Sequence, residues 1–246
     1  MAGLQRSALA LAAPSSYFAI GACFAIGLCL ALGLAQPARA QFSAAVGVQS
    51  DYRYRGISLS SGLPAATLDL SYDHSSGIYA GASTIGAIVG GHAESLGFIE
   101  YLGYATPRRG GVSWDVGVNN QNLAYYADKR YALNYSEVYV GVVGDGLSAH
   151  LHYSPNYLQP GYGALYAELD GSLKPAEKWR LFAHLGATVP VGDTDGRHPR
   201  YDARAGVARQ FGPLEVQASV TTTNPDPPRL TPHHRTALVV GASWFF

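Results

Sequence analysis

The chain ends in Leu238-Val239-Val240-Gly241-Ala242-Ser243-Trp244-Phe245-Phe246. In an extended stretch, successive side chains point to opposite faces. Leu238, Val240, Ala242, Trp244 and Phe246 then share one face that is apolar throughout, whereas the interleaved positions are smaller and more mixed. This alternation predicts a β-strand that has lipid on one side.

The aromatic ending has a second implication. An aromatic residue at the last position, with another two positions earlier, resembles the terminal strand by which bacterial outer-membrane β-barrels are recognised by their assembly machinery. We therefore expect Trp244 and Phe246 to be the assembly signal. A soluble β-sandwich that ends on a buried strand is the competing interpretation.

The first 40 residues have the layout of a secretory signal peptide. Arg6 precedes an apolar run over residues 18–34, and Ala38-Arg39-Ala40 follows as an Ala-x-Ala cleavage site. The sequence thus predicts a cleaved signal at 1–40 and one barrel domain at 41–246. A retained membrane anchor is the alternative.

The composition after residue 40 excludes several classes of protein. Both cysteines lie within the predicted signal, so residues 41–246 can form neither a disulfide nor a thiolate metal site. The remaining 15 basic and 17 acidic residues leave a formal charge of −2 and form no basic run, which argues against a nucleic-acid partner.

Residues 41–246 divide into twelve runs of strand-like alternation, and most of them are close to the ~9–11 residues of a membrane-crossing strand. The runs are 43–54, 65–74, 76–84, 94–105, 111–120, 131–143, 146–153, 163–173, 178–188, 201–210, 214–223 and 234–246. Short connections alternate with longer ones. The longer connections are 55–64, 85–93, 121–130, 155–162, 189–200 and 224–233. This alternation predicts an all-β protein with a single antiparallel transmembrane β-barrel of about twelve strands in the bacterial outer membrane. Because the strand number is even, we expect the first and the last strand to have their chain termini on the short-turn, periplasmic side.

The segment Ser50-Asp51-Tyr52-Arg53-Tyr54-Arg55-Gly56-Ile57-Ser58 resembles the opening motif of the TorF-like porins, a bacterial family of unknown function (Gcw_chp). The resemblance continues through residues 72–79, 100–104, 135–139 and 153–157 and so covers most of the chain. It implies an outer-membrane barrel that passes small solutes. It supplies neither an established substrate nor catalytic residues.

The strand phase places many charged side chains on the inner side of the expected barrel. Charges in the membrane zone need water or a partner, so we expect them to line a wet or ion-paired interior. The candidate pore-lining residues are Asp51, Arg53, Arg55, Asp115, Glu137, Glu168, Asp170, Arg180, His184, Asp202 and Arg204. Because runs eight to ten are neighbours in a meander, we expect the carboxylates of run eight, Glu168 and Asp170, to meet Arg180 and Arg204. Such pairs would either brace a narrow barrel or form a selectivity constriction.

An enzyme and a metal site are weaker interpretations. Outer-membrane lipid hydrolases are similar in placing a His base and a Ser nucleophile two residues apart on one strand, as in His152-Tyr153-Ser154, but that pair must face lipid. Here the phase turns His152 and Ser154 inward. His150 and His152 share a face, and His233-His234 lie in a loop near Asp226, yet no spacing fixes a third ligand. We expect no enzyme activity, no metal ion and no cofactor.

The function predicted from these features is a porin-like channel for passive diffusion of small hydrophilic solutes or ions. Its expected partners are outer-membrane lipid, the barrel-assembly machinery and the solutes themselves. Twelve strands imply a narrow lumen that Tyr135, Tyr139, Tyr166 and Phe182 could close. The alternatives are a plugged structural or loop-binding barrel and an outer-membrane lipid hydrolase.

Overall fold

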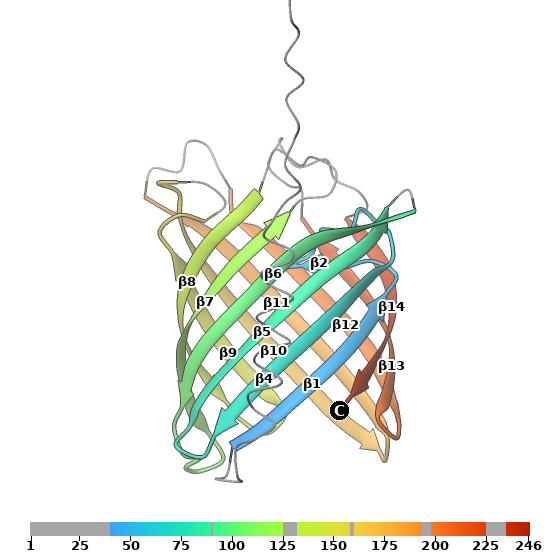
Figure 1. Cartoon of the computed structure of the whole chain (residues 1–246). Helices are drawn as coiled ribbons and strands as arrows, with labels where there is room; N and C mark the ends of the chain where they lie inside the picture. Colours follow the sequence, from blue (N-terminus) through green and yellow to red (C-terminus); the bar gives the residue numbers. More distant parts are fainter. Residues whose placement is uncertain (1–39, 90, 125–131, 158–159, 193–197, 225–234) are drawn as a thin grey trace, which may run out of the picture. The chain divides into compact units, whose positions relative to one another are not determined.

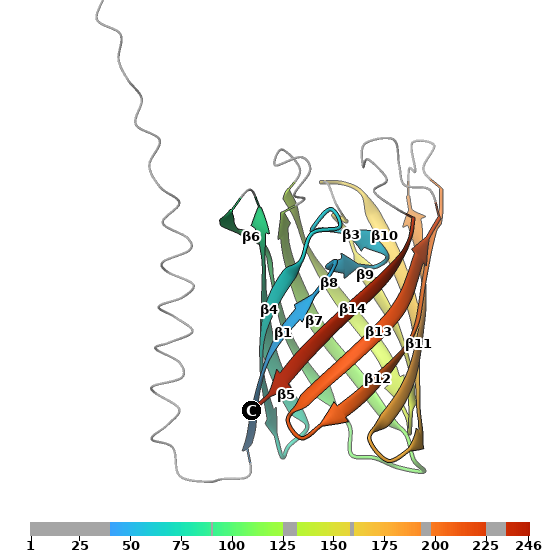
Figure 2. The ribbon, with the colours of Figure 1, turned by 90° about the vertical axis from the view of Figure 1, so that its right-hand side faces the viewer.

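A computed structural model describes residues 40–89, 91–124, 132–157, 160–192, 198–224 and 235–246. These residues form a closed barrel of twelve antiparallel strands in meander order (Figures 1 and 2). The barrel strands are β1 (Ala40–Gln49), β4 (Ala65–His74), β5 (Ile78–Val89), β6 (His92–Ala105), β7 (Ser113–Ala124), β8 (Ala132–Val143), β9 (Leu147–Ser154), β10 (Gly163–Ala176), β11 (Trp179–Val191), β12 (Arg200–Phe211), β13 (Leu214–Thr223) and β14 (Thr236–Phe245). The predicted twelve-strand barrel is confirmed. Residues 1–39 of the predicted signal lie outside the described residues.

The first and last strands of the barrel meet. Val46 of β1 lies opposite Trp244 of β14 on one side and opposite Leu68 of β4 on the other. Each of the twelve described barrel strands therefore pairs with two neighbours, so none of them exposes an unpaired backbone edge to lipid.

The outer face of the barrel is mainly apolar, as the terminal strand predicted. Leu238, Val240, Trp244 and Phe246 are all exposed, whereas Val239 between them is buried. The apolar outer face is interrupted on β6, β7 and β8, where the polar side chains of Glu100, Asn120 and Ser136 form an exposed hydrogen-bonded row. The described residues contain no helix that is long and apolar enough to cross a membrane.

The loop predicted at 85–93 is wrong. β5 continues to Val89 and β6 begins at His92, and these two residues pair with each other. The pairing register shifts between Ile85 and Gly86, which is the signature of a β-bulge. A bulge interrupts the two-residue alternation without ending the strand, so in the sequence it resembles a loop.

The first predicted strand, 43–54, also needs correction. β1 ends at Gln49, and residues 50–64, which we call the inner hairpin, turn into the barrel and form β2 (Arg53–Tyr54) and β3 (Ile57–Ser58). Tyr54 pairs with Ile57 across Arg55 and Gly56, whose φ angles are 48° and 78°. Two successive positive φ values are those of a type I′ turn, which suits a two-residue hairpin.

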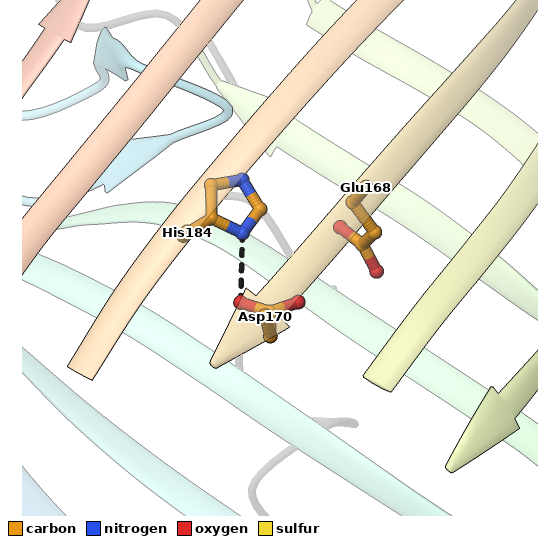
Figure 3. A group of neighbouring side chains, drawn as sticks. All are labelled: Glu168, Asp170 and His184. Atoms are coloured by element: carbon orange, nitrogen blue, oxygen red, sulfur yellow. Dashed lines mark hydrogen bonds and ion pairs between the residues drawn. The ribbon is translucent and has the colours of Figure 1, made fainter. Parts of the chain in front are cut away.

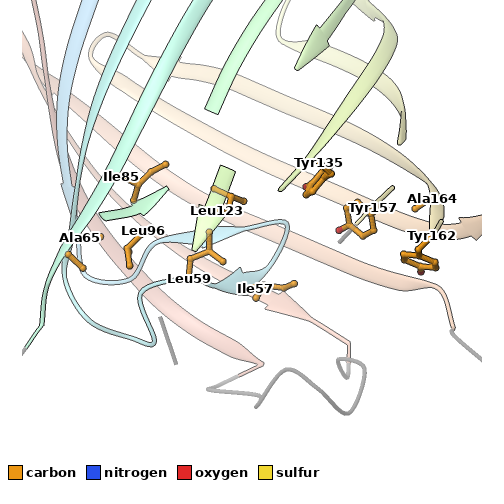
Figure 4. Packing of buried hydrophobic residues seen from close by; sticks show 11 residues of the cluster. Ile57, Leu59, Ala65, Ile85, Leu96, Leu123, Tyr135, Tyr157, Tyr162 and Ala164 are labelled. Carbon is orange, nitrogen blue, oxygen red and sulfur yellow. The ribbon is translucent and has the colours of Figure 1, made fainter. Parts of the chain in front are cut away.

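An apolar core inside the barrel holds the inner hairpin against the wall (Figure 4). Ile57 and Leu59 of the hairpin belong to one buried cluster with side chains of β4 to β8, β10 and the β9–β10 connection. The wall members of the cluster are Ala65, Ile85, Ala87, Leu96, Leu123, Tyr135, Tyr157, Tyr162 and Ala164. Burial of the Leu59 side chain alone contributes about 1.5–3 kcal/mol of stabilising free energy, so the hydrophobic effect favours the hairpin inside the barrel.

Candidate functional site

A chamber of about 700 Å³ lies inside the barrel beside the inner hairpin. Asp51, Arg53 and Arg55 of the hairpin line it together with side chains of β10 to β13. Eight of the eleven candidate residues line this chamber: Asp51, Arg53, Arg55, Asp170, Arg180, His184, Asp202 and Arg204. Gly144 and Gly146 of the β8–β9 turn also line it, so the chamber extends to the short-turn end of the barrel.

The inner hairpin is organised around the buried carboxylate of Asp51. This group accepts hydrogen bonds from the hydroxyls of Ser58 and Ser60 and from the backbone N–H of Gly62. It also pairs with Nε of Arg53 at 2.6 Å. These contacts fold the hairpin back on itself and explain why β1 cannot continue through residue 54.

Arg55 at the tip of the hairpin reaches the opposite wall. Its Nη1 and Nη2 donate to the two carboxylate oxygens of Glu137 on β8, each at 2.7 Å, and its guanidinium carbon lies 3.8 Å from the centre of the Tyr166 ring. The two charged side chains are 6% and 2% exposed. The hairpin is therefore fixed across the barrel by a buried bidentate ion pair.

The tip of the hairpin also touches the chamber wall at β12 and β13. A Cβ atom on Gly56 would lie 2.8 Å from the Cβ atoms of both Asp202 on β12 and Thr223 on β13. With Arg55 held at β8, the hairpin spans the interior from one wall to the other.

The remaining acidic candidates belong to a network of histidines and carboxylates. Asp115 accepts from Tyr79 and lies 3.0 Å from Nε2 of His150. Glu168 lies 3.1 Å from Nε2 of His152. Of the aromatic residues expected to close the lumen, Tyr135 lies in the apolar core, Tyr139 hydrogen-bonds Tyr79, Tyr166 packs under Arg55, and Phe182 lines the chamber.

The predicted pairs of Glu168 and Asp170 with Arg180 and Arg204 are wrong. The register puts His184, not an arginine, opposite Asp170, and it puts Gly186 opposite Glu168. Arg180 instead donates to Glu215 of β13 at 2.5 Å. Arg204 donates from Nε to Ser219 at 3.1 Å and from Nη2 to Gln217 at 3.2 Å. Knowing which strands are neighbours is not enough to predict the ion pairs, because the register of the strands decides which side chains meet.

The comparisons with known proteins place this barrel among bacterial proteins. The family described as "Bacterial protein of unknown function (Gcw_chp)" matches residues 35–246. The chain belongs to the Gcw_chp family. No curated protein matches it in sequence.

Solved structures similar to this Gcw_chp protein include two porins. The KdgM porin has a TM-score of 0.50 at 13% sequence identity, over 84% of this chain and 99% of that chain. The NanC porin has a TM-score of 0.55 at 8% identity, over 83% of this chain and 99% of that chain. At these identities the likeness shows the fold. The closed barrel with its mainly apolar outer face places this Gcw_chp protein in the bacterial outer membrane.

One group of side chains in the Gcw_chp barrel has the composition of a metal site. Glu168 and Asp170 of β10 and His184 of β11 each offer one ligand atom, and these atoms lie within 4.8 Å of one another (Figure 3). Nδ1 of His184 is 2.8 Å from Asp170, and its Nε2 is 3.1 Å from Asp202. Both ring nitrogens are thus hydrogen-bonded to carboxylates, so binding a metal ion would require this arrangement to break. Asp226, His233 and His234 lie outside the described residues.

His152 and Ser154 of this Gcw_chp protein are buried inside the barrel, as the strand phase predicted. His152 lies beside the carboxylates of Glu168 and Glu137, and Oγ of Ser154 accepts from the backbone N–H of Asn156. Among the described residues the two side chains form no hydrogen bond with each other. The lipid-facing His–Ser pair of a lipid hydrolase is therefore not formed.

Proposed function

We propose that this outer-membrane barrel is a channel for passive diffusion of small hydrophilic solutes or ions, and not an enzyme. The observation that carries the proposal is the chamber of about 700 Å³, which is lined by charged groups of both signs. Charges at membrane depth are tolerated where they reach water or a partner. A wet chamber inside an apolar cylinder provides the route, and the porins of similar fold support this interpretation.

The inner hairpin is the constriction of the proposed channel. The chamber reaches the short-turn end, which faces the periplasm in outer-membrane barrels. At the hairpin the interior narrows, because Arg55 and Gly56 contact opposite walls. In this proposal the rate of solute passage depends on how far the hairpin moves away from the barrel wall. Glu137 then braces the constriction, Asp115 and Glu168 hold His150 and His152 in the barrel wall, and the eight chamber residues form the pore lining.

The proposed maturation follows the general route of outer-membrane barrels. Residues 1–40 are removed as a signal peptide, and the assembly machinery recognises the terminal strand through Trp244 and Phe246. Both aromatic side chains are exposed on the outer face, where a recognising protein or lipid can reach them.

A plugged structural barrel is the second candidate, and the inner hairpin is the observation that favours it. Its apolar core with β4 to β8, β10 and the β9–β10 connection fills part of the interior. The two functions differ in one property: a plugged barrel passes no solute.

Solute uptake by liposomes tests the proposal. Liposomes containing the protein purified from outer membranes should swell rapidly in arabinose and more slowly in the larger sugar raffinose. Migration that differs between boiled and unboiled samples on a gel confirms that the protein is folded. Folded protein that gives no more swelling than protein-free liposomes would overturn the channel and leave the plugged barrel.

A further inference from the structure

Arg204 differs from the other arginines that line the chamber. Arg53, Arg55 and Arg180 pair with Asp51, Glu137 and Glu215, respectively. Among the described residues, no carboxylate oxygen lies within 4.0 Å of the Arg204 guanidinium. The guanidinium is half-buried and lines the chamber, and no carboxylate among the described residues is hydrogen-bonded to it.

One neighbour of Arg204 adds a hydrogen-bond donor. Ser219 and Gln217 both accept from the guanidinium. Ser219 is buried, whereas Gln217 lines the chamber and its amide N–H₂ can donate to a solute. Arg204 uses its Nε and one hydrogen of Nη2 in these contacts, so Nη1 and the second hydrogen of Nη2 are left. Arginine presents these donors in a planar fork that matches a carboxylate.

Phe182 helps to fix the direction of this fork. The guanidinium carbons of Arg204 and Arg180 lie 4.9 and 5.0 Å from the centre of its ring. A Cβ atom on Gly206, directly opposite Phe182 in the register, would lie 2.5 Å from the ring, so only glycine leaves room for it. The packed ring restricts Arg204 before any ligand arrives, which lowers the entropy lost on binding.

The part of the wall beside Arg204 carries carboxylates. His184 on the adjacent strand β11 is the register partner of Arg204, and it hydrogen-bonds Asp170 and Asp202. The Asp170 side chain is 47% exposed, so its carboxylate can also accept hydroxyl groups of a solute. One end of the chamber wall thus suits a carboxylate, and the neighbouring part suits hydroxyls.

We propose that Arg204 and Gln217 form a binding site for a small hydroxylated carboxylate, with Arg204 holding the carboxylate and the buried Ser219 orienting its guanidinium. The site rests on the proposed function, since the channel brings the solute to the chamber. The volume of about 700 Å³ lies within the range of ~300–1,000 Å³ that is typical of sites for small molecules.

Direct binding tests the site independently of transport. Gluconate and sorbitol share a six-carbon polyol chain and differ in the carboxylate, so ligand-observed NMR on the detergent-purified protein should detect gluconate binding at least tenfold stronger than sorbitol binding. Arg204→Gln should weaken gluconate binding at least tenfold. Arg209→Gln is the matched control, because Arg209 lies on the outer face over Trp179 and Phe211, and it should change nothing.

A second variant keeps the test decisive if Arg204→Gln does not fold. Gln217→Glu places a carboxylate beside Arg204 and should also weaken gluconate binding. Equal binding of gluconate and sorbitol, or unchanged gluconate binding in both variants, would overturn the site. Inorganic phosphate binding as tightly as gluconate would overturn the choice of a hydroxylated carboxylate.

If gluconate binds but liposomes do not swell, the channel fails and the site stands. If liposomes swell but gluconate does not bind, the site fails alone.

Discussion

At the scale of single residues, the buried pair of Arg55 and Glu137 is the contact on which the constriction depends. Both groups are almost fully buried, and they share two hydrogen bonds of 2.7 Å. A buried ion pair is weak evidence for net stability, but removing one partner is costly because it leaves an uncompensated charge. The pair therefore determines where the inner hairpin rests more than how stable the barrel is.

Glu137→Gln should detach the hairpin tip from β8. The change leaves Arg55 buried beside a neutral amide, and the expected cost is about 3–5 kcal/mol if the hairpin stays in place. Denaturant unfolding in detergent would measure this cost, and faster arabinose uptake by liposomes would indicate that the hairpin has moved instead. Glu177→Gln in the exposed β10–β11 turn is the control and should affect neither. An unchanged unfolding midpoint together with unchanged uptake would contradict the importance of the pair.

Gly56 and Gly62 give a matched pair of substitutions within the hairpin. Their φ angles are 78° and 75°, so alanine at either position is strained by about 1–2 kcal/mol. Only at Gly56 would the new Cβ also collide with the wall, since a Cβ atom on Gly62 would have no neighbour within 4 Å. Gly56→Ala should therefore raise sugar uptake, whereas Gly62→Ala should lower stability alone. Equal uptake by the two variants would show that the hairpin tip does not pack as described.

At the scale of elements, the barrel strands could be predicted from the sequence and the inner hairpin could not. Alternating polarity depends on the residues of one strand and on lipid outside, so it is visible in a run such as 214–223. The hairpin depends on Asp51 meeting Ser58, Ser60 and Gly62, and on Arg55 meeting Glu137 82 positions away. The Arg55-Gly56 step was a usable local signal for a turn, but the apolar and polar alternation around it favoured a longer strand.

Shortening the inner hairpin should widen the channel. The backbone N–H of Leu59 donates to the carbonyl of Tyr52 at 2.8 Å, so a Gly-Gly link can replace Arg53–Ser58 without stretching the chain. Loss of the tip removes the contacts with β8, β12 and β13, and raffinose should then enter liposomes nearly as fast as arabinose. Replacing Arg108 and Arg109 by glycines in the exposed β6–β7 turn is the control and should leave raffinose slow. Slow raffinose entry through the shortened protein would mean that the constriction lies elsewhere.

At the scale of the whole molecule, closure and the position of the charges follow from one pattern. Alternation along each strand puts apolar side chains toward lipid and polar ones inside, and pairing of β1 with β14 closes the sheet. Strand phase sufficed to place candidates such as Arg180 and Arg204 on the inner side. Their partners could not be predicted, because Glu215, Gln217 and Ser219 are reached only through the register of β12 with β13.

Single-channel recording in planar bilayers tests the central claim most directly. If the chamber is part of a continuous aqueous route, the purified protein should give discrete conductance steps, and the protein with the shortened hairpin should give larger ones. Inserted, folded protein that gives no steps in either form would contradict the account, because the barrel would then be closed to ions even without the hairpin tip.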